Sequence, residues 1–149
     1  MEVIVPAAGQ SSRFPNMKPK YLLYDYKHDL MLTNSIKPYL NYNVTVGILK
    51  EHDEKYNASK FIKHDLGNKV HIVILDEPTS GPAETVAKII EARDLKNEEI
   101  LIKDCDSFFD HEVESGNYVC VSNIREHEVL KKLSSKSFVV SNENGIITE

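Results

Sequence analysis

The chain has 149 residues, of which 41% are hydrophobic and 28% charged, and its formal net charge is −5 at pH 7. This length and composition are typical of one globular domain, which we expect over residues 1–149. An acidic chain without a dense run of Lys and Arg is not expected to bind nucleic acid. The two cysteines lack metal-ligand spacing, and no apolar run has the length of a membrane span or a secretory signal. We therefore expect a cytoplasmic protein with no membrane partner.

The beginning of the chain combines a short strand pattern with small and basic residues. Val3–Val5 is a β-branched apolar run that predicts a buried strand, and it is followed by Pro6. The next residues are small or polar and end in a basic one: Ala7, Ala8, Gly9, Gln10, Ser11, Ser12 and Arg13. Small side chains after a strand let backbone N–H groups approach a phosphate, and Arg13 and Lys20 add positive charge. The pattern predicts a triphosphate-binding loop; an ordinary strand-to-helix turn followed by an exposed lysine turn is the alternative.

Helical and strand patterns alternate along the rest of the chain. Helices are predicted over 29–40 with Asp29 as N-cap, over 51–66 and over 82–93, and strands over 44–49, 70–75, 99–103 and 118–122, with a hairpin at 138–148. The run at 70–75 is nearly all apolar, so we expect it at the centre of the sheet. The alternation predicts a Rossmann-like α/β fold: a mostly parallel sheet with helices on both faces and a carboxy-terminal hairpin.

In such a sheet, ligands bind at the carboxyl ends of the strands. This rule brings together three segments of the chain: 7–20, 79–84 and 104–106. Asp104 and Asp106 follow a buried strand, where carboxylates suit Mg²⁺, although either side chain could instead cap a turn. Gly81 is expected as the N-cap of a helix whose first residue is Pro82. We expect these segments to form one site.

The amino-terminal stretch resembles the signature of the sugar-1-phosphate nucleotidyltransferases, an Ala-Gly-x-Gly-x-Arg loop followed at a distance by Pro-Lys. Gly9, Arg13, Pro19 and Lys20 match this signature, and Ser11 stands at its second glycine. The resemblance implies an enzyme that moves a nucleoside monophosphate from a nucleoside triphosphate to a phosphorylated sugar or similar small acceptor. Pyrophosphate would be the leaving group.

The resemblance also implies a role for each matching residue. Arg13 would hold the leaving pyrophosphate, Lys20 the α-phosphate and Asp106 the Mg²⁺ ion, with Asp104 beside the nucleotide. Gly81-Pro82-Ala83 resembles the family's Gly-Thr-Ala segment, whose backbone approaches the base and ribose.

Two other functions are compatible with the same residues. Asp104-x-Asp106 also looks like the metal motif of glycosyltransferases, which use a preformed sugar nucleotide. The resemblance covers only the amino-terminal part of a typical nucleotidyltransferase, and no later Asp matches the family's second metal ligand. We therefore expect a chain that is truncated relative to the family, and a catalytically incomplete nucleotide-binding module is the second alternative. The sequence predicts neither the base, the acceptor nor the oligomeric state.

Overall fold

The computed structural model describes residues 1–10, 16–108, 112–114, 116–121 and 139–148. The chain divides into two compact units, Met1–His111 and Glu112–Glu149. The first unit contains, in chain order, β1 (Glu2–Pro6), η1 (Lys20–Leu22), α1 (Met31–Ile36), η2 (Lys37–Tyr39), β2 (Asn43–Leu49), α2 (Lys50–Tyr56), α3 (Ala58–Leu66), η3 (Gly67–Lys69), β3 (Val70–Leu75), α4 (Pro82–Arg93) and β4 (Ile100–Ile102). None of the helices in the described ranges is both long enough and apolar enough to cross a bilayer. The single nucleotide-binding domain over 1–149 stays a prediction.

The first unit has the α/β fold that the sequence predicts. Its four strands pair in the order β3-β2-β1-β4, and every pair is parallel. The chain moves from β1 through β2 to β3 and then returns across the sheet to β4, on the other side of β1. The point where the direction reverses therefore lies between β1 and β4, and it is at such switch points that open α/β sheets bind ligands.

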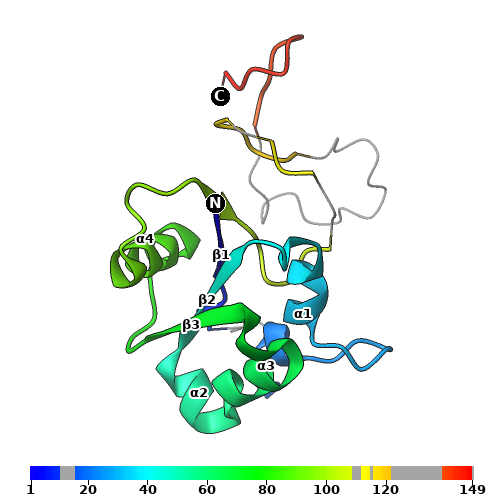
Figure 1. The fold of residues 1–149 in the computed structure, drawn as a ribbon, viewed down its shortest axis with the longest axis vertical. Helices are drawn as coiled ribbons and strands as arrows, with labels where there is room; N and C mark the ends of the chain where they lie inside the picture. The colour runs from blue at the N-terminus through cyan, green and yellow to red at the C-terminus, as the bar shows by residue number, and fades with distance from the viewer. Residues whose placement is uncertain (11–15, 109–111, 115, 122–138, 149) are drawn as a thin grey trace. The chain divides into compact units, whose positions relative to one another are not determined.

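Helices cover both faces of the sheet (Figure 1). Ile4 of β1 packs with Val86 and Ile89 of α4, so alternate residues of β1 face this helix. Val3 and Val5 point to the opposite face, where α1 and α3 lie, and both are fully buried. Residues on both faces of β1 thus lie in the core, which explains its unbroken apolar run.

Strand β3 corrects one prediction. Its apolar run suggested a central strand, but among the described strands β3 lies at the edge and pairs only with β2. Ile74 is 45% exposed, whereas the central β1 has fully buried residues. The apolar run therefore predicts a strand, but it reports neither full burial nor the number of strands beside it.

The predicted helices need two corrections. The predicted helix over 51–66 is two helices, α2 and α3, because Asn57 takes a left-handed conformation with φ 53° between them; Asn tolerates this conformation better than most residues. The N-cap of α1 is Leu30 and not Asp29. The Asp25 side chain accepts hydrogen bonds from the backbone N–H groups of Lys27 and Asp29 in the loop before α1.

The second unit contains part of the predicted hairpin. Ser141 and Ile147 form an antiparallel bridge, and the intervening turn includes Gly145 at φ 75°. The Asn142 side chain accepts hydrogen bonds from the N–H groups of Asn144 and Ile146 at 3.0 and 2.9 Å. The predicted strand over 118–122 is not formed in its described part, where Val119 and Val121 are exposed. A strand requires a paired neighbour, and a β-branched run alone does not supply one.

Gly47 of β2 carries the closest contact between the sheet and α4. A Cβ atom at this position would lie 2.5 Å from Cδ1 and 2.9 Å from Cγ1 of the buried Ile89. We predict that Gly47→Ala lowers the free energy of unfolding by about 1–3 kcal/mol, measured by urea denaturation. Ile89→Val removes Cδ1, so the double variant should lose less than the sum of the two single losses. Gly9→Ala is the control because its Cβ would meet no atom of the described residues within 4 Å; equal losses in Gly47→Ala and Gly9→Ala would contradict the packing argument.

Candidate functional site

The candidate site lies at the carboxyl ends of β1 and β4, next to the switch point of the sheet. Strand β1 ends at Pro6 and continues into Ala7–Gln10, and β4 ends at Ile102 and continues into Lys103. The N–H of Lys103 donates to the carbonyl of Ile4 at 2.9 Å, so the ladder between the two strands extends one residue beyond β4. This pairing fixes where both following segments begin.

The described part of the predicted phosphate loop begins buried and then becomes exposed. Ala7 and Ala8 are 2% and 3% exposed, and the N–H of Ala7 donates to the carbonyl of Gly47 at 2.8 Å. The Ala7 N–H is therefore used in the hydrogen bonding of the sheet and does not point to a ligand. Gly9 and Gln10 are exposed, and no atom of the described residues lies within 4 Å of the position of a Cβ on Gly9, so none of them blocks the approach of a ligand to its backbone. Ser11, Ser12 and Arg13 lie outside the described residues.

The structure brings together Lys20 and Asp106, which are 86 positions apart in the sequence. Lys20 begins the single turn η1 after Pro19, and its Nζ lies 3.0 Å from Oδ2 of Asp106. Their side chains are 33% and 35% exposed, so solvent and solutes can reach both. A cation and a carboxylate held side by side can contact a phosphate and a metal ion at the same time.

Lys103, which precedes these carboxylates, is a buried lysine. It is 1% exposed, and its Nζ donates to the side chains of Ser35 and Ser107, both at 2.9 Å. The same ammonium donates to the backbone carbonyls of Asp104 at 3.0 Å and Ser107 at 2.6 Å. Burial lowers the pKa of Lys103, while the nearby Asp104 favours its charged form. These bonds hold the turn that carries Asp106.

Cys105 lies within the same turn, near Tyr21 of η1. Burial, together with the charges of Asp106 and Asp104, raises the pKa of the Cys105 thiol to about 12. The thiol is therefore protonated at neutral pH and is a poor nucleophile. Tyr21 follows Lys20 in η1 and is buried, and this burial raises the pKa of its phenol. Its hydroxyl lies 3.2 Å from Nδ1 of His52. These groups support η1 from the protein interior.

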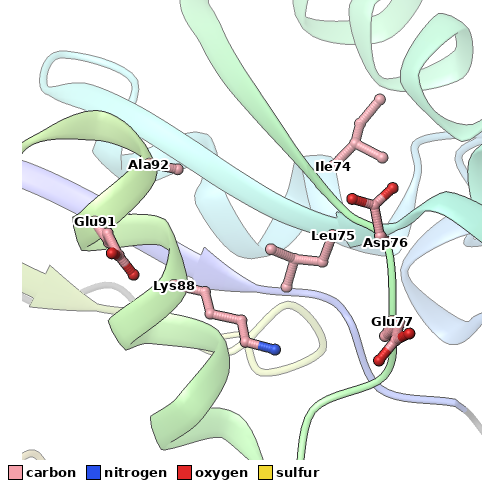
Figure 2. Close-up of a pocket in the computed structure, with 7 residues that line it drawn as sticks. All are labelled: Ile74, Leu75, Asp76, Glu77, Lys88, Glu91 and Ala92. Atoms are coloured by element: carbon pink, nitrogen blue, oxygen red, sulfur yellow. The ribbon is translucent and has the colours of Figure 1, made fainter.

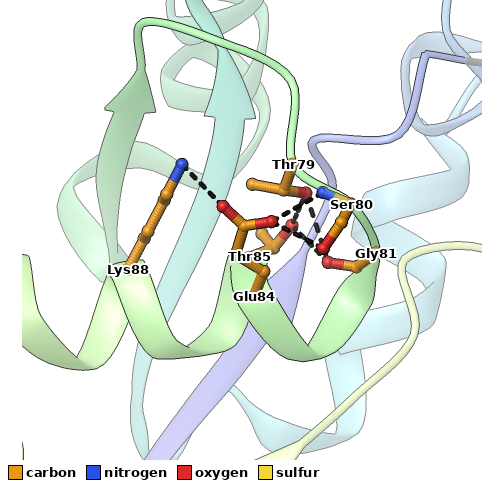
Figure 3. Close-up of polar contacts among 6 residues, drawn as sticks. All are labelled: Thr79, Ser80, Gly81, Glu84, Thr85 and Lys88. Atoms are coloured by element: carbon orange, nitrogen blue, oxygen red, sulfur yellow. Dashed lines mark hydrogen bonds and ion pairs between the residues drawn. The ribbon is translucent and has the colours of Figure 1, made fainter.

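A polar network fixes the segment before α4 (Figure 3). Gly81 is the N-cap of α4 and Pro82 its first residue, as predicted. The N–H and the hydroxyl of Ser80 both donate to Glu84 at 2.7 Å, and Lys88 lies 3.0 Å from the other carboxylate oxygen. Gly81 has an extended backbone, and a Cβ there would meet no atom of the described residues within 4 Å. The described side chains therefore leave the surface at Gly81 open, and contact of Gly81, Pro82 and Ala83 with a base stays a prediction.

A separate pocket of about 450 Å³ lies between the carboxyl end of β3 and α4 (Figure 2). Its walls are Ile74, Leu75, Asp76 and Glu77 from the strand end, with Lys88, Glu91 and Ala92 from the helix. None of the described residues that were predicted to bind nucleotide lines it. Leu75 also packs against Ala8 and Leu49, so the pocket and the loop after β1 share one core cluster.

The residues suit a metal ion bound together with a substrate, and not a metal ion held by protein alone. The described part of the chain contains no cluster of three or more His, Cys, Asp or Glu side chains that could enclose an ion. Asp106 offers one partly exposed carboxylate, and Asp104 follows the same strand. Mg²⁺ commonly binds one or two carboxylates and takes its other ligands from phosphates and water. The donor set therefore fits a Mg²⁺–nucleotide complex.

The sequence pattern does not identify Lys103 and Ser35 as part of this site. A lysine after a strand is ordinarily interpreted as a solvated residue, because lysines are almost never fully buried. The position of Lys103 between an apolar strand and Asp-Cys-Asp-Ser is the signal that could have indicated its burial. The Ser80–Glu84 pair had a recognisable signal, since a glutamate in the first turn of a helix commonly bonds to the residues before it.

Comparisons with known proteins identify a similar fold. No protein-family model matches the chain, and no curated protein matches it. Among solved structures, the chain resembles a nucleoside-diphosphate-sugar pyrophosphorylase from Vibrio cholerae RC9, with a TM-score of 0.60 and 23% sequence identity. The similarity covers 77% of this chain and 51% of that chain, so the chain spans about half the length of this neighbour. The similarity shows that the two proteins share an α/β fold.

The Ser80–Glu84 network predicts a pH dependence of stability. Hydrogen bonds from Ser80, and the ion pair with Lys88, lower the pKa of Glu84 from 4.5 to about 2. A carboxylate with a lowered pKa stabilises the folded state fully above its ordinary pKa, and this contribution is lost as the pH falls through the folded-state value. The difference in stability between the wild type and Glu84→Gln should therefore shrink from pH 4.5 toward pH 2. Urea denaturation across this range measures it, with Glu91→Gln on the same helix as the control; a constant difference would contradict the assignment.

Proposed function

We propose that the chain binds a nucleoside triphosphate and transfers its nucleoside monophosphate to a phosphorylated sugar or similar small acceptor. The observation that carries this proposal is the pairing of Lys20 with Asp106 at 3.0 Å. This pair joins the amino-terminal loop to the end of β4, at the edge where the topology favours a ligand. The fold shared with a nucleoside-diphosphate-sugar pyrophosphorylase is consistent with the proposal.

In the proposed reaction, an oxygen of the acceptor phosphate attacks the α-phosphorus of the triphosphate. A new phosphorus–oxygen bond forms, the bond between the α-phosphorus and the bridging oxygen breaks, and pyrophosphate leaves with that bond's electron pair. Catalysis of this kind depends on positioning and on stabilising charge. Lys20 would bind the α-phosphate, and Arg13 would hold the departing pyrophosphate.

The remaining residues would hold the substrate in place. Exposed backbone at Gly9 and Gln10, with Ser11 and Ser12, would face the phosphates, and Gly81 would face the base. Asp106, with Asp104 nearby, would hold Mg²⁺. When bound, the ion would neutralise charge on the phosphate oxygens. Lys20 and Asp106 would then each exchange their mutual contact for a contact with the Mg²⁺–nucleotide complex.

Binding can be tested with a thermal-shift panel of nucleoside triphosphates, with and without Mg²⁺. We predict that one triphosphate raises the melting temperature and that Lys20→Ala weakens its binding about 10- to 100-fold, the effect of losing a charge-assisted hydrogen bond. Asp106→Asn should remove the Mg²⁺ dependence. Lys69→Ala is the control, because Lys69 lies at the opposite, amino-terminal end of β3 and should have no effect. A wild-type chain that no triphosphate stabilises would contradict the proposal.

Turnover needs a separate measurement. If the chain is a nucleotidyltransferase, a sugar nucleotide and labelled pyrophosphate should yield labelled triphosphate in the presence of Mg²⁺. We predict that Lys20→Ala and Asp106→Asn each reduce this rate at least 100-fold, because both groups would contact the reacting phosphates. Hydrolysis of the sugar nucleotide to a nucleoside diphosphate would indicate a glycosyltransferase. Triphosphate binding without any exchange would indicate a nucleotide-binding module.

A further inference from the structure

Lys103 is the most unusual charged group in the described residues. Lysine side chains are almost never fully buried, yet Lys103 is 1% exposed. Burial of an ammonium group is costly unless its hydrogen bonds are satisfied. Four oxygen atoms lie between 2.6 and 3.0 Å from its Nζ, so the cost is offset by polar contacts. The role proposed above for the site does not use this residue.

The acceptors of Lys103 lie on both sides of Asp106. The carbonyl of Asp104 precedes Asp106 by two residues, and the carbonyl and hydroxyl of Ser107 follow it. One ammonium therefore holds both ends of a turn of four residues. With Ser35 Oγ there are four acceptors among the described residues and three N–H bonds, so one N–H is shared between two oxygens.

The same ammonium connects the turn to helix α1. Lys103 donates to Ser35 Oγ, and this hydroxyl donates in turn to the carbonyl of Asp104 at 2.5 Å. Ser35 is fully buried in α1, so the turn is attached to an element packed in the core. The position of Asp106 is therefore fixed relative to α1. Its Oδ2 lies 3.0 Å from Nζ of Lys20.

We infer that Lys103 is a positioning residue that sets the carboxylate of Asp106 beside Lys20. It contacts no substrate itself, and it acts through the turn 104–107. The effect of Lys103 on metal-dependent nucleotide binding rests on the proposed function. The effect of Lys103 on the turn is independent of the proposed function, because it follows from hydrogen bonds within the protein.

The hold on the turn can be measured without any ligand. Cys105 lies within the turn and is partly buried, so its labelling by a thiol reagent reports opening of the turn. In a Cys120→Ser background, we expect Lys103→Met to accelerate Cys105 labelling at least 10-fold while amide exchange in α4 stays unchanged. Lys50→Met is the matched control, because Lys50 follows β2 as Lys103 follows β4 but has an exposed side chain. Unchanged labelling, or equal acceleration of labelling and of α4 exchange, would overturn the inference.

A second variant and a binding measurement complete the test. Ser35→Ala removes one acceptor and keeps the ammonium, so it should accelerate labelling less than Lys103→Met, and it replaces Lys103→Met if that variant does not fold. Binding is then measured with the triphosphate that stabilises the wild type. Lys103→Met should weaken binding in the presence of Mg²⁺ at least 10-fold and leave binding without Mg²⁺ within about twofold of the wild type. Ser35→Ala takes its place here too if Lys103→Met does not fold. Combining the substitution with Asp106→Asn should add no further loss. If the variant labels faster but its nucleotide binding depends on Mg²⁺ as in the wild type, the inference is overturned. If the wild type binds no triphosphate, the proposed function is overturned, and the labelling experiment alone decides the role of Lys103.

Discussion

Strand β1 is hydrogen-bonded on both of its edges, to β2 over five residue pairs and to β4 over three. This double pairing places the carboxyl ends of β1 and β4 next to each other, although the two strands are about 100 residues apart in the chain. The loop after β1 and the turn after β4 therefore start from neighbouring, fixed positions. The contact between Lys20 and Asp106 depends on this arrangement.

Polar groups, buried in one case and exposed in the other, then fix the segments that follow the strands. Lys103 ties the turn after β4 to α1, and the Ser80–Glu84 contact ties the segment before α4 to the first turn of that helix. In both segments a charged side chain bonds to backbone groups that no strand or helix satisfies. Such bonds make each segment rigid at the point where a ligand would contact it.

The sequence could predict the four strands of the sheet, because apolar periodicity is a local pattern, but it also predicted a strand over 118–122 that is not formed in its described part. The topology rule predicted that the segments carrying Lys20 and Asp106 lie at one edge of the sheet, and it did not predict the contact between the two side chains. The burial of Lys103 could not be predicted, since it depends on a serine 68 positions away. The edge position of β3 and the break at Asn57 also escaped prediction, because strand neighbours and one residue's φ angle leave no periodic signal.

If Lys20 and Asp106 form the nucleotide site, a crystal structure with a nucleoside triphosphate and Mn²⁺ in place of Mg²⁺ should show the ion there. We expect an anomalous Mn²⁺ peak at the Asp106 carboxylate and the phosphate oxygens, with Lys20 contacting the α-phosphate. A triphosphate bound instead in the pocket between β3 and α4, with Lys20 still paired to Asp106, would contradict this assignment.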